Sequence, residues 1–538
     1  MSTERSPLLS SAQEERSYTD HAPAHSAVED VESAAPEEVK KPAMVTIIVP
    51  LVLGIFLAAL DTTIVVSSYT VIGSELNQLQ STSWIATAYM LTATSFQALY
   101  GKLSDIFGRK ACLLFAYTVF ALGCLFCGLA RNMTELIAAR ALAGAGGGGM
   151  STVVSIILSD VVPLRSRGTW QGILNIIFAT GSVTGAPLGG ILADSIGWRW
   201  GFLIQVPIAA LAIVAVIVFL HLPHADRSHF RAKLRRVDFA GAVLLILTIF
   251  SLLFALDRGG NVSWTDRATL ASALVFLVSL PVFLFVEFRV AAEPFVPLRL
   301  VGNRDLMASL MTNFWQFFTT TPVLFNLALY YQAVMSLSAG QAGAYLIPSV
   351  IAGTTGSLGG GLIMQKTGKY YRLTVAAYVL FAAGVSGIAF NTGTAKHALV
   401  WFVVALLVQG IGGGTGVTTS LISLIANAGT EDQAIATAGS YLFRSLGQVT
   451  GLAIASTILQ DVLRKTLHQR LHGLDVDEIV KRVRESLAYL EELDPESRGI
   501  VRYSYEHALN TVFWFTAVTA ALALVSSIFI RETELGQR

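Results

Sequence analysis

Long apolar segments alternate with short polar ones along almost the whole chain. Each of fourteen such segments approaches or exceeds the roughly 20 residues that a helix needs to cross a bilayer. Their apolar residues run continuously and do not alternate, which excludes a transmembrane β-barrel. The sequence therefore predicts an all-α polytopic membrane protein, with spans near 45–69, 83–103, 111–130, 134–158, 170–193, 200–221, 238–257, 268–289, 307–334, 340–364, 371–391, 397–426, 434–462 and 509–530.

Composition agrees with this pattern and narrows the function. Of the 538 residues, 53% are hydrophobic and 14% are charged, whereas soluble proteins carry roughly 25% charged residues. Lys plus Arg (37) balances Asp plus Glu (36), so no basic excess points to nucleic acid. No phosphate-binding GKS/T loop and no cluster of metal ligands or nucleophile–base pairs stands in the spans. The sequence therefore predicts neither an enzyme nor a metal or cofactor site, and any transport by this chain would be secondary rather than driven by ATP.

All three cysteines fall within one apolar stretch. Cys124 and Cys127 have the CxxC spacing, which also occurs in metal and redox sites. Because the surrounding segment reads as a membrane-embedded helix, we interpret both as apolar helix residues rather than as a metal or redox site.

The distribution of charge predicts how the chain is oriented. Residues 1–44 are polar and rich in acids, and they read as a disordered tail. Loops on one side of the expected spans carry far more Lys and Arg than loops on the other, and positive loops stay cytoplasmic. Both termini, including the short tail 531–538, are therefore expected in the cytoplasm. The long charged loop 463–508 is expected on the opposite, lumenal side.

The N-terminal tail contains a short pattern that resembles a sorting signal. Glu4 precedes Leu8 and Leu9, a pattern similar to the acidic dileucine signal by which sorting adaptors send membrane proteins to vacuoles and lysosomes. The alternative is a plain tail on a plasma-membrane protein.

Three pairs of segments repeat at nearly one offset. The pairs are 101–110 with 361–369, 144–149 with 410–415, and 181–185 with 447–451. The sequence therefore predicts two similar six-helix halves.

This repeat defines the expected domains. The N-terminal half is 45–221 and the C-terminal half is 307–530. The segment 222–306 inserts two further spans between them. Parallel repeats of this kind place a substrate site near the bilayer midplane, between the halves.

The segments just described resemble signatures of the major facilitator superfamily. The fourteen spans are similar to its drug:proton antiporter branch, and within it the chain most resembles fungal vacuolar basic amino acid transporters. The resemblance covers the chain from about residue 44 onward. It implies alternating access, in which one half rocks against the other.

GKLSDIFGRK resembles the family's cytoplasmic gate motif, which latches the two halves together in the outward-facing state. Its glycines allow tight turns and close helix approach. Its acid can pair with the following arginine or lie at a helix N-terminus. The matching residues are Gly101, Asp105, Gly108, Arg109 and Lys110.

Asp61 and Arg140 are the candidates for coupling. Asp61 lies about 22 Å along the first span at the α-helical rise, in a sequence that resembles the first-span signature of the antiporter branch. A carboxylate there can bind a proton or a cationic amine, and an acid in hydrocarbon is costly unless paired, protonated or hydrated. Arg140 matches the family arginine linked to proton transfer, and it is able to hold Asp61 ionised. The alternatives are an acid bonded to Thr62 or Thr63 and an arginine that snorkels to the interface.

GSVTGAPLGG in span 5 resembles the motif that marks antiporters, although Ala186 separates the second glycine from the proline. Small residues at this spacing permit close helix contact, and the proline bends the helix. The alternative is ordinary helix packing without meaning for transport. The motif residues are Gly181, Gly185, Pro187, Gly189 and Gly190.

Polar residues on the apolar spans of the second half are candidates for the cavity. Each alone is more often a hydrogen bond between helices than a ligand contact. They are Asn313, Gln316, Asn326, Tyr330, Tyr331, Gln332, Tyr345, Gln409, Tyr441, Arg444 and Gln448. If the substrate is basic, a fixed positive charge in the cavity would repel it. Arg444 would then need a partner or a place outside the transport pathway.

The resemblance leads to one expected function and two alternatives. The expected function is a proton-coupled antiporter that moves cationic amino acids into the vacuole. The same fold and coupling also suit a plasma-membrane exporter of drugs or toxins. A non-transporting nutrient sensor would need a long signalling tail, and neither tail offers one.

Overall fold

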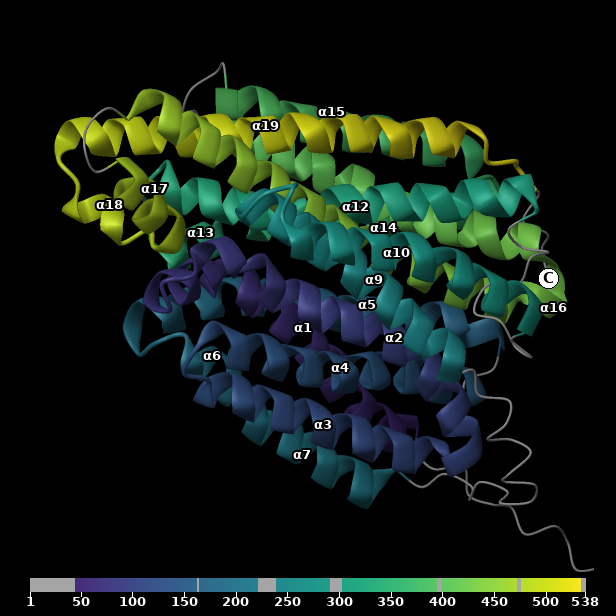
Figure 1. The fold of residues 1–538 in the computed structure, drawn as a ribbon. Coiled ribbons are helices and arrows are strands. Elements are labelled where there is room, and N and C mark those ends of the chain that lie inside the picture. The colour runs from purple at the N-terminus through teal and green to yellow at the C-terminus, as the bar shows by residue number, and fades with distance from the viewer. Residues whose placement is uncertain are drawn as a thin grey trace, which may run out of the picture. The chain divides into compact units, whose positions relative to one another are not determined.

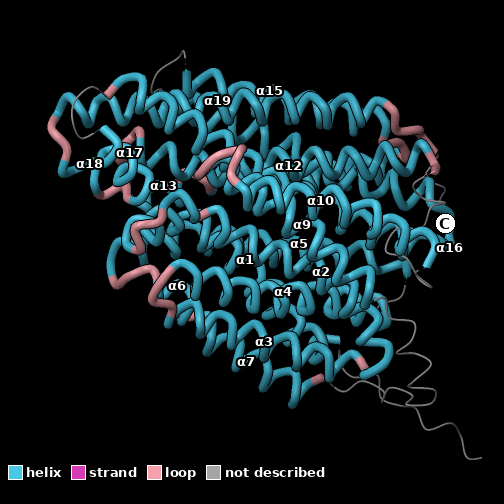
Figure 2. Tube along the Cα trace, in the orientation of Figure 1, coloured by secondary structure: helices cyan, strands magenta, loops and turns pink. Residues whose placement is uncertain are grey.

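Nearly all of the described chain is helical (Figure 2). The computed structural model describes residues 44–161, 164–220, 239–290, 302–393, 399–471 and 476–533. Glu4, Leu8 and Leu9 lie outside these ranges. Within them there is no strand, which agrees with the predicted all-α class.

The N-terminal half contains a long helix at each of its expected spans. Glycine, alanine and other small residues between the bulky apolar ones let these helices approach closely. The helices are α1 (Met44–Glu75), α2 (Ser83–Phe107), α3 (Arg109–Leu129), α4 (Met133–Val161), α5 (Leu164–Ser195), α6 (Arg199–Leu203) and α7 (Gln205–Phe219), with the short 3-10 turn η1 (Leu79–Ser81).

The insertion and the C-terminal half follow. The inserted helices are α9 (Phe239–Asn261) and α10 (Arg267–Phe285), followed by η2 (Val286–Val290). The C-terminal half comprises α12 (Arg304–Ala333), α13 (Ala339–Ala344), α14 (Ile347–Thr367), α15 (Tyr371–Gly393), α16 (Leu399–Arg470), α17 (Val476–Glu485), α18 (Tyr489–Glu492) and α19 (Pro495–Ile528).

The predicted count of fourteen spans is not confirmed. In the described residues, 12 helical segments are long and apolar enough to cross a membrane. Helices α2 and α12 also occupy expected spans, but they are not among the 12. Both contain many hydroxyl and amide side chains, which lower their apolar character.

Helix α16 folds back on itself. Its 72 residues would extend for roughly 108 Å if straight. However, Arg444 Nη2 donates to the carbonyl oxygen of Val417 at 3.3 Å, and these residues would lie about 40 Å apart in a straight helix. The segment therefore contains two antiparallel spans, Val400–Ala428 and Gly439–Arg470.

The sequence repeat is also a repeat of contacts. A Cβ at Gly146 would meet the backbone of Ala116 and Phe120 in α3. A Cβ at Gly412 would likewise meet the backbone of Ala377 and Phe381 in α15. Equivalent glycines therefore set the same close helix approach in both halves.

The halves lie on opposite flanks of the bundle. In Figure 1, α3 and α7 form one outer edge and α15 and α19 the other, with α1 and α12 between them. One end of the bundle carries α6, α13, α17 and α18, which we call the α13 end. The C-terminus lies at the opposite end.

The inserted helix α9 packs against both halves. Trp84 of α2 lies 6.0 Å from Phe250 of α9, measured between ring centroids. On the other side, Thr457 of α16 donates to the carbonyl oxygen of Leu256 at 3.1 Å. Helix α10 is mostly exposed and apolar, which suits a surface that faces lipid.

The segment predicted as loop 463–508 is largely helical. Helix α16 continues to Arg470, α17 and α18 follow, and α19 already begins at Pro495. Its α17–α18 part binds other elements, since Tyr505 donates to the carbonyl oxygen of Val483 at 2.9 Å and the amide of Leu487 donates to Ser74 at 2.8 Å. The segment therefore closes over the α13 end.

Substituting Gly146 by valine should destabilise the protein by about 1–3 kcal/mol or more, because the new side chain overlaps backbone that cannot move aside. Thermal unfolding of the purified protein in detergent measures the effect. Gly359→Val is the matched control, because a Cβ at Gly359 meets no atom within 4 Å. Equal melting temperatures for the two variants would contradict the packing described.

Candidate functional site

Asp61 and Arg140 form a fully buried ion pair. Arg140 Nη1 donates to both carboxylate oxygens of Asp61 at 2.8 Å. The side chains are 0% and 1% exposed, respectively. Arg140 does not extend to the surface, because its side chain is buried against Asp61. Asp61 does not bond to Thr62 or Thr63, because both threonine hydroxyls donate to backbone carbonyls of α1.

Neighbouring helices of the same half provide further contacts to the two charged side chains. Arg140 Nε donates to the carbonyl oxygen of Ile85 at 3.1 Å, and Gln205 Nε2 donates to Asp61 Oδ1 at 3.3 Å. The ring of Tyr89 lies 4.4 Å from the guanidinium carbon. Removing one partner of such a pair leaves a buried charge uncompensated.

The antiporter-like motif packs against the part of α1 that carries Asp61. A Cβ at Gly181 would meet the carbonyl oxygen of Phe56, and one at Gly185 would meet Leu60 and Thr63. A Cβ at Gly189 would meet Ile64. Pro187 lies inside α5. These glycines therefore let α5 lie directly on α1.

Gly190 continues this face toward the other half. A Cβ there would overlap the backbone of Ala339 in α13. Gly343 of α13 meets α5 in the same way, at the carbonyl of Ala186. The motif thus packs α5 against α1 on one side and against α13 on the other.

The gate motif lies at the α2–α3 junction. Gly108 adopts φ +89°, a conformation that favours glycine. Arg109 donates to Asp160 at the end of α4 at 3.0 Å, and Lys110 donates to the carbonyl oxygen of Ile217 at 2.9 Å. The side chain of Asp105 lies outside the described residues.

The motif glycines are expected to allow tight turns and close helix approach. Gly108 forms the turn, whereas no close approach is seen at Gly101. A Cβ there would meet no atom within 4 Å, and the same holds for its repeat partner Gly361. Space is open at this position in both halves.

Several cavity candidates bond to other helices or to their own. Gln316 donates to the carbonyl of Gly413 at 2.7 Å and accepts from Tyr378 at 2.6 Å. Gln409 accepts from Ser349 at 3.0 Å. Asn326 donates to the carbonyl of Pro322 at 2.9 Å, within its own helix, and also borders a cavity.

Among the aromatic candidates for the cavity, some are buried inside the C-terminal half and one is exposed. Tyr330 and Tyr331 are fully buried against Phe402, inside the C-terminal half. The ring of Tyr345 lies 5.7 Å from that of Tyr331. Tyr441 is 38% exposed, beside Arg444.

Arg444 belongs to a second polar cluster. Its Nε donates to Asn313 Oδ1 at 3.0 Å, and the same oxygen accepts from Ser420 at 3.1 Å. Asn313 Nδ2 donates to the carbonyl of Ser309 at 3.0 Å, which fixes the amide orientation. The cluster joins α12 to both spans of α16.

Hydrogen bonds between the halves gather at the α13 end in the described chain. Tyr69 donates to the carbonyl of Phe325 at 2.7 Å, and Thr70 bonds to Gln332. The amide of Gly340 donates to Asp194 at 2.8 Å. The halves are therefore packed together at this end.

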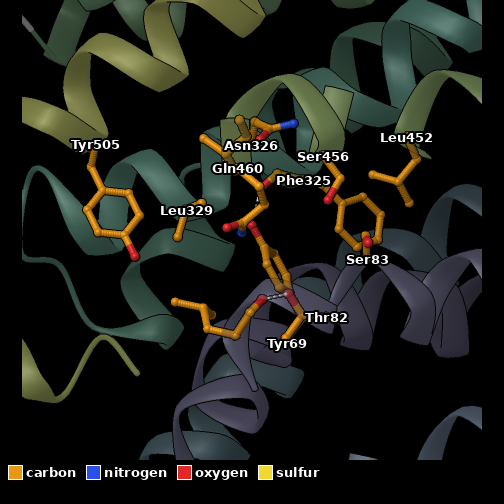
Figure 3. A pocket seen from close by; sticks show the side chains of 12 residues that line it. Tyr69, Thr82, Ser83, Phe325, Asn326, Leu329, Leu452, Ser456, Gln460 and Tyr505 are labelled. Carbon is orange, nitrogen blue, oxygen red and sulfur yellow. Dashed lines mark hydrogen bonds between the residues drawn. The ribbon is translucent and has the colours of Figure 1, made fainter. Parts of the chain in front are cut away.

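A small cavity remains between the halves near these contacts. Figure 3 shows Tyr69, Asn326, Ser456 and Gln460 around it, contributed by α1, α12 and α16. Its volume of about 30 Å³ has room for ordered water but not for an amino acid. The halves therefore leave no room for an amino acid in this part of their contact at the α13 end.

Sequence reasoning missed Gln205. It lies in the stretch GWRWGFLIQVP, whose tryptophans suggest an interfacial role, and it contacts Asp61. A glutamine within an apolar span is itself a costly residue, and that signal was available.

The chain matches known proteins over most of its length. Residues 51–455 match the model of the Major Facilitator Superfamily. The vacuolar membrane amino acid uptake transporter fnx2 of Schizosaccharomyces pombe is 40% identical, over 90% of this chain and 84% of its own.

Two further relatives point to different cargo. The multidrug resistance protein fnx1 of S. pombe is 36% identical, over 90% of this chain and 92% of its own. The vacuolar basic amino acid transporter 2 of Saccharomyces cerevisiae is 33% identical, over 83% of this chain and 97% of its own.

The fold also matches a solved transporter structure. A bacterial homolog of the human lysosomal transporter Spinster, in an inward-facing and unoccupied conformation, aligns with a TM-score of 0.61. It covers 90% of this chain and 96% of its own at 14% identity, so the likeness concerns the fold alone.

Arg140→Gln should lower stability by about 3–5 kcal/mol, because it leaves the Asp61 carboxylate buried without its partner. Adding Asp61→Asn should recover part of this loss. The matched control is Arg199→Gln, whose pair with Glu75 is 37% and 47% exposed and worth at most about 1 kcal/mol. Thermal unfolding in detergent compares them, and similar losses for both arginine variants would refute the assignment.

Proposed function

The chain belongs to the major facilitator superfamily, and on that basis we propose that it is a proton-coupled antiporter that moves basic amino acids into the vacuole. The buried Asp61–Arg140 pair carries the proposal, because it places a titratable carboxylate inside a span. The vacuolar amino acid transporters among the relatives support this cargo and this membrane.

Asp61 is proposed as the proton site rather than the amine site. Its carboxylate is already occupied by Arg140 and Gln205, and a substrate amine would have to displace both. A proton needs only a path of water. Protonation would remove the charge attraction that joins α1 to α4 and would free Arg140.

The contacts at the α13 end support alternating access. With both termini in the cytoplasm, that end faces the vacuolar lumen, so the halves are closed toward the lumen and the pair is sealed from it. Separation of the halves there would admit lumenal protons to Asp61. The open space beside Gly101 suits a gate whose latch is released in this state.

The second candidate function is a drug:proton exporter of the plasma membrane. The similarity to the multidrug resistance protein fnx1 favours it. The two functions differ in cargo and membrane, and they share the coupling.

Vacuolar vesicles that contain the protein should take up labelled lysine, arginine and histidine in the presence of a proton gradient. An uncoupler should stop this uptake, and Asp61→Asn should reduce it at least tenfold because the variant cannot carry the proton. Vesicles without the protein are the control. Absence of protein-dependent uptake, in vesicles shown to contain it, would move the drug exporter to first place.

Linking the halves at the α13 end should stop transport. Thr70→Cys with Gln332→Cys, joined by a short bifunctional thiol reagent, would hold the contact that must break. A reductant-cleavable reagent should make the block reversible.

The control pair is Ser357→Cys with Thr418→Cys, whose hydroxyls lie 2.6 Å apart within one half. Linking this pair should leave transport near the wild-type level. Full transport after the first link would mean that the halves do not separate at this end.

A further inference from the structure

Arg444 is a buried cation whose partners are neutral. It is 9% exposed, and its two hydrogen bonds go to Asn313 Oδ1 at 3.0 Å and the carbonyl of Val417 at 3.3 Å. Within the described ranges no carboxylate pairs with it. A guanidinium has five N–H donors, so three of them have no acceptor among the described side chains.

The buried arginine of the N-terminal half, Arg140, differs from Arg444 in having a carboxylate partner. Arg140 is 1% exposed and has a carboxylate on the same nitrogen at 2.8 Å. An uncompensated charge within a span is costly, and such residues usually mark a ligand pathway. Arg444 therefore lacks the anion that Arg140 has.

The surroundings of Arg444 suit a ligand rather than a fixed partner. Tyr441, which is 38% exposed, lies 5.4 Å from the guanidinium, and Phe317 lies at 5.5 Å. Both rings lie beside the guanidinium, and the partly exposed ring of Tyr441 places the cluster near the surface of the helix bundle. Asn313 lies early in α12, away from the closed α13 end, so the cluster belongs to the side opposite the closure.

Asn313 holds the guanidinium in one orientation. Its Oδ1 accepts from Arg444 and Ser420, while its amide is tied to the carbonyl of Ser309. The amide group cannot rotate without losing these bonds. Asn313 is therefore a positioning residue that leaves the free face of Arg444 available.

We propose that Arg444 binds the α-carboxylate of the transported amino acid. Arginine binds carboxylates through two parallel hydrogen bonds, which adds geometric selectivity to charge attraction. This inference rests on the proposed function and adds to it that the cargo needs a carboxylate. It also resolves the conflict between a fixed cation and a basic substrate, because the carboxylate of the substrate compensates Arg444.

The inference separates two sites. Asp61 and Arg140 exchange the proton within the N-terminal half, and Arg444 with Asn313 holds the cargo within the C-terminal half. A cation that lacks a carboxylate gains nothing at Arg444 and is repelled by it. The cluster thus distinguishes amino acids from cationic drugs.

Lysine and cadaverine test this directly, because cadaverine is lysine without its carboxylate; agmatine is the same control for arginine. In vesicle uptake, the wild type should prefer lysine strongly over cadaverine. Arg444→Gln should raise the KM for lysine at least tenfold and remove the preference, while Arg444→Lys should retain part of both. Arg482→Gln, at an exposed position of α17, is the matched control.

Asn313→Asp is the second variant, because it keeps the side-chain shape and gives Arg444 an internal carboxylate. The new carboxylate loses the hydrogen bond that the Asn313 amide donates to the carbonyl of Ser309, and it gains a charge pair with Arg444 that offsets this loss. We expect the variant to fold and still to lose the preference for lysine over cadaverine. Lysine-dependent thermal stabilisation of the purified protein provides a readout independent of transport. This stabilisation should be present in the wild type and reduced in both variants.

The outcomes separate the two proposals. If the wild type transports lysine, and Arg444→Gln and Asn313→Asp keep its KM and the preference over cadaverine, the carboxylate site is overturned and the antiporter stands. If the wild type neither transports nor is stabilised by lysine, arginine or histidine, the proposed function fails and the carboxylate site fails with it. If Arg444→Gln does not fold, Asn313→Asp decides.

Discussion

The cost of placing charge inside the membrane constrains the whole N-terminal half. Asp61 and Arg140 can stay buried only because the guanidinium reaches both carboxylate oxygens and because Ile85 and Gln205 fill further hydrogen-bonding positions. Four helices must keep their spacing for this to hold. The close glycine contacts between α5 and α1 fix one side of that arrangement.

The two halves share their packing but not their chemistry. Equivalent glycines set the same helix approach in both, as at Gly146 and Gly412. Gly185 meets Leu60 and its repeat partner Gly451 meets Phe318, so Thr319 stands where the N-terminal half has Asp61. The offset of the glycine-rich segments places Leu406 where it has Arg140. The duplicated scaffold thus carries an ion pair in one half and an arginine with neutral partners in the other. The halves meet where α5 packs on α13 and where α1 bonds to α12, and these contacts connect the two sites.

Sequence reasoning succeeded where local rules dominate. Apolar run length predicted the helices, and the repeated glycines mark helix contacts that recur at Gly146 and Gly412. The suggestion that Arg140 holds Asp61 agrees with the hydrogen bonds between the two side chains. It failed where a residue's role depends on contacts with residues far away in the sequence. The docking of α17–α18 depends on Ser74, more than 400 residues away. The role of Gly101 depends on a conformation, and the partners of Gln316 and Gln409 depend on which helix lies opposite. A polar residue in a span looks the same in sequence whether it faces a neighbour or a ligand.

Proton movement during amino acid transport tests the central claim most directly. Purified protein is reconstituted into liposomes with an acidic interior and an internal pH dye, and lysine is added outside. The account predicts that lysine entry drives protons out, so that the interior becomes more alkaline, and that Asp61→Asn abolishes this signal. Lysine entry without any change of internal pH, or with further acidification, would contradict antiport and the role of the buried pair in it.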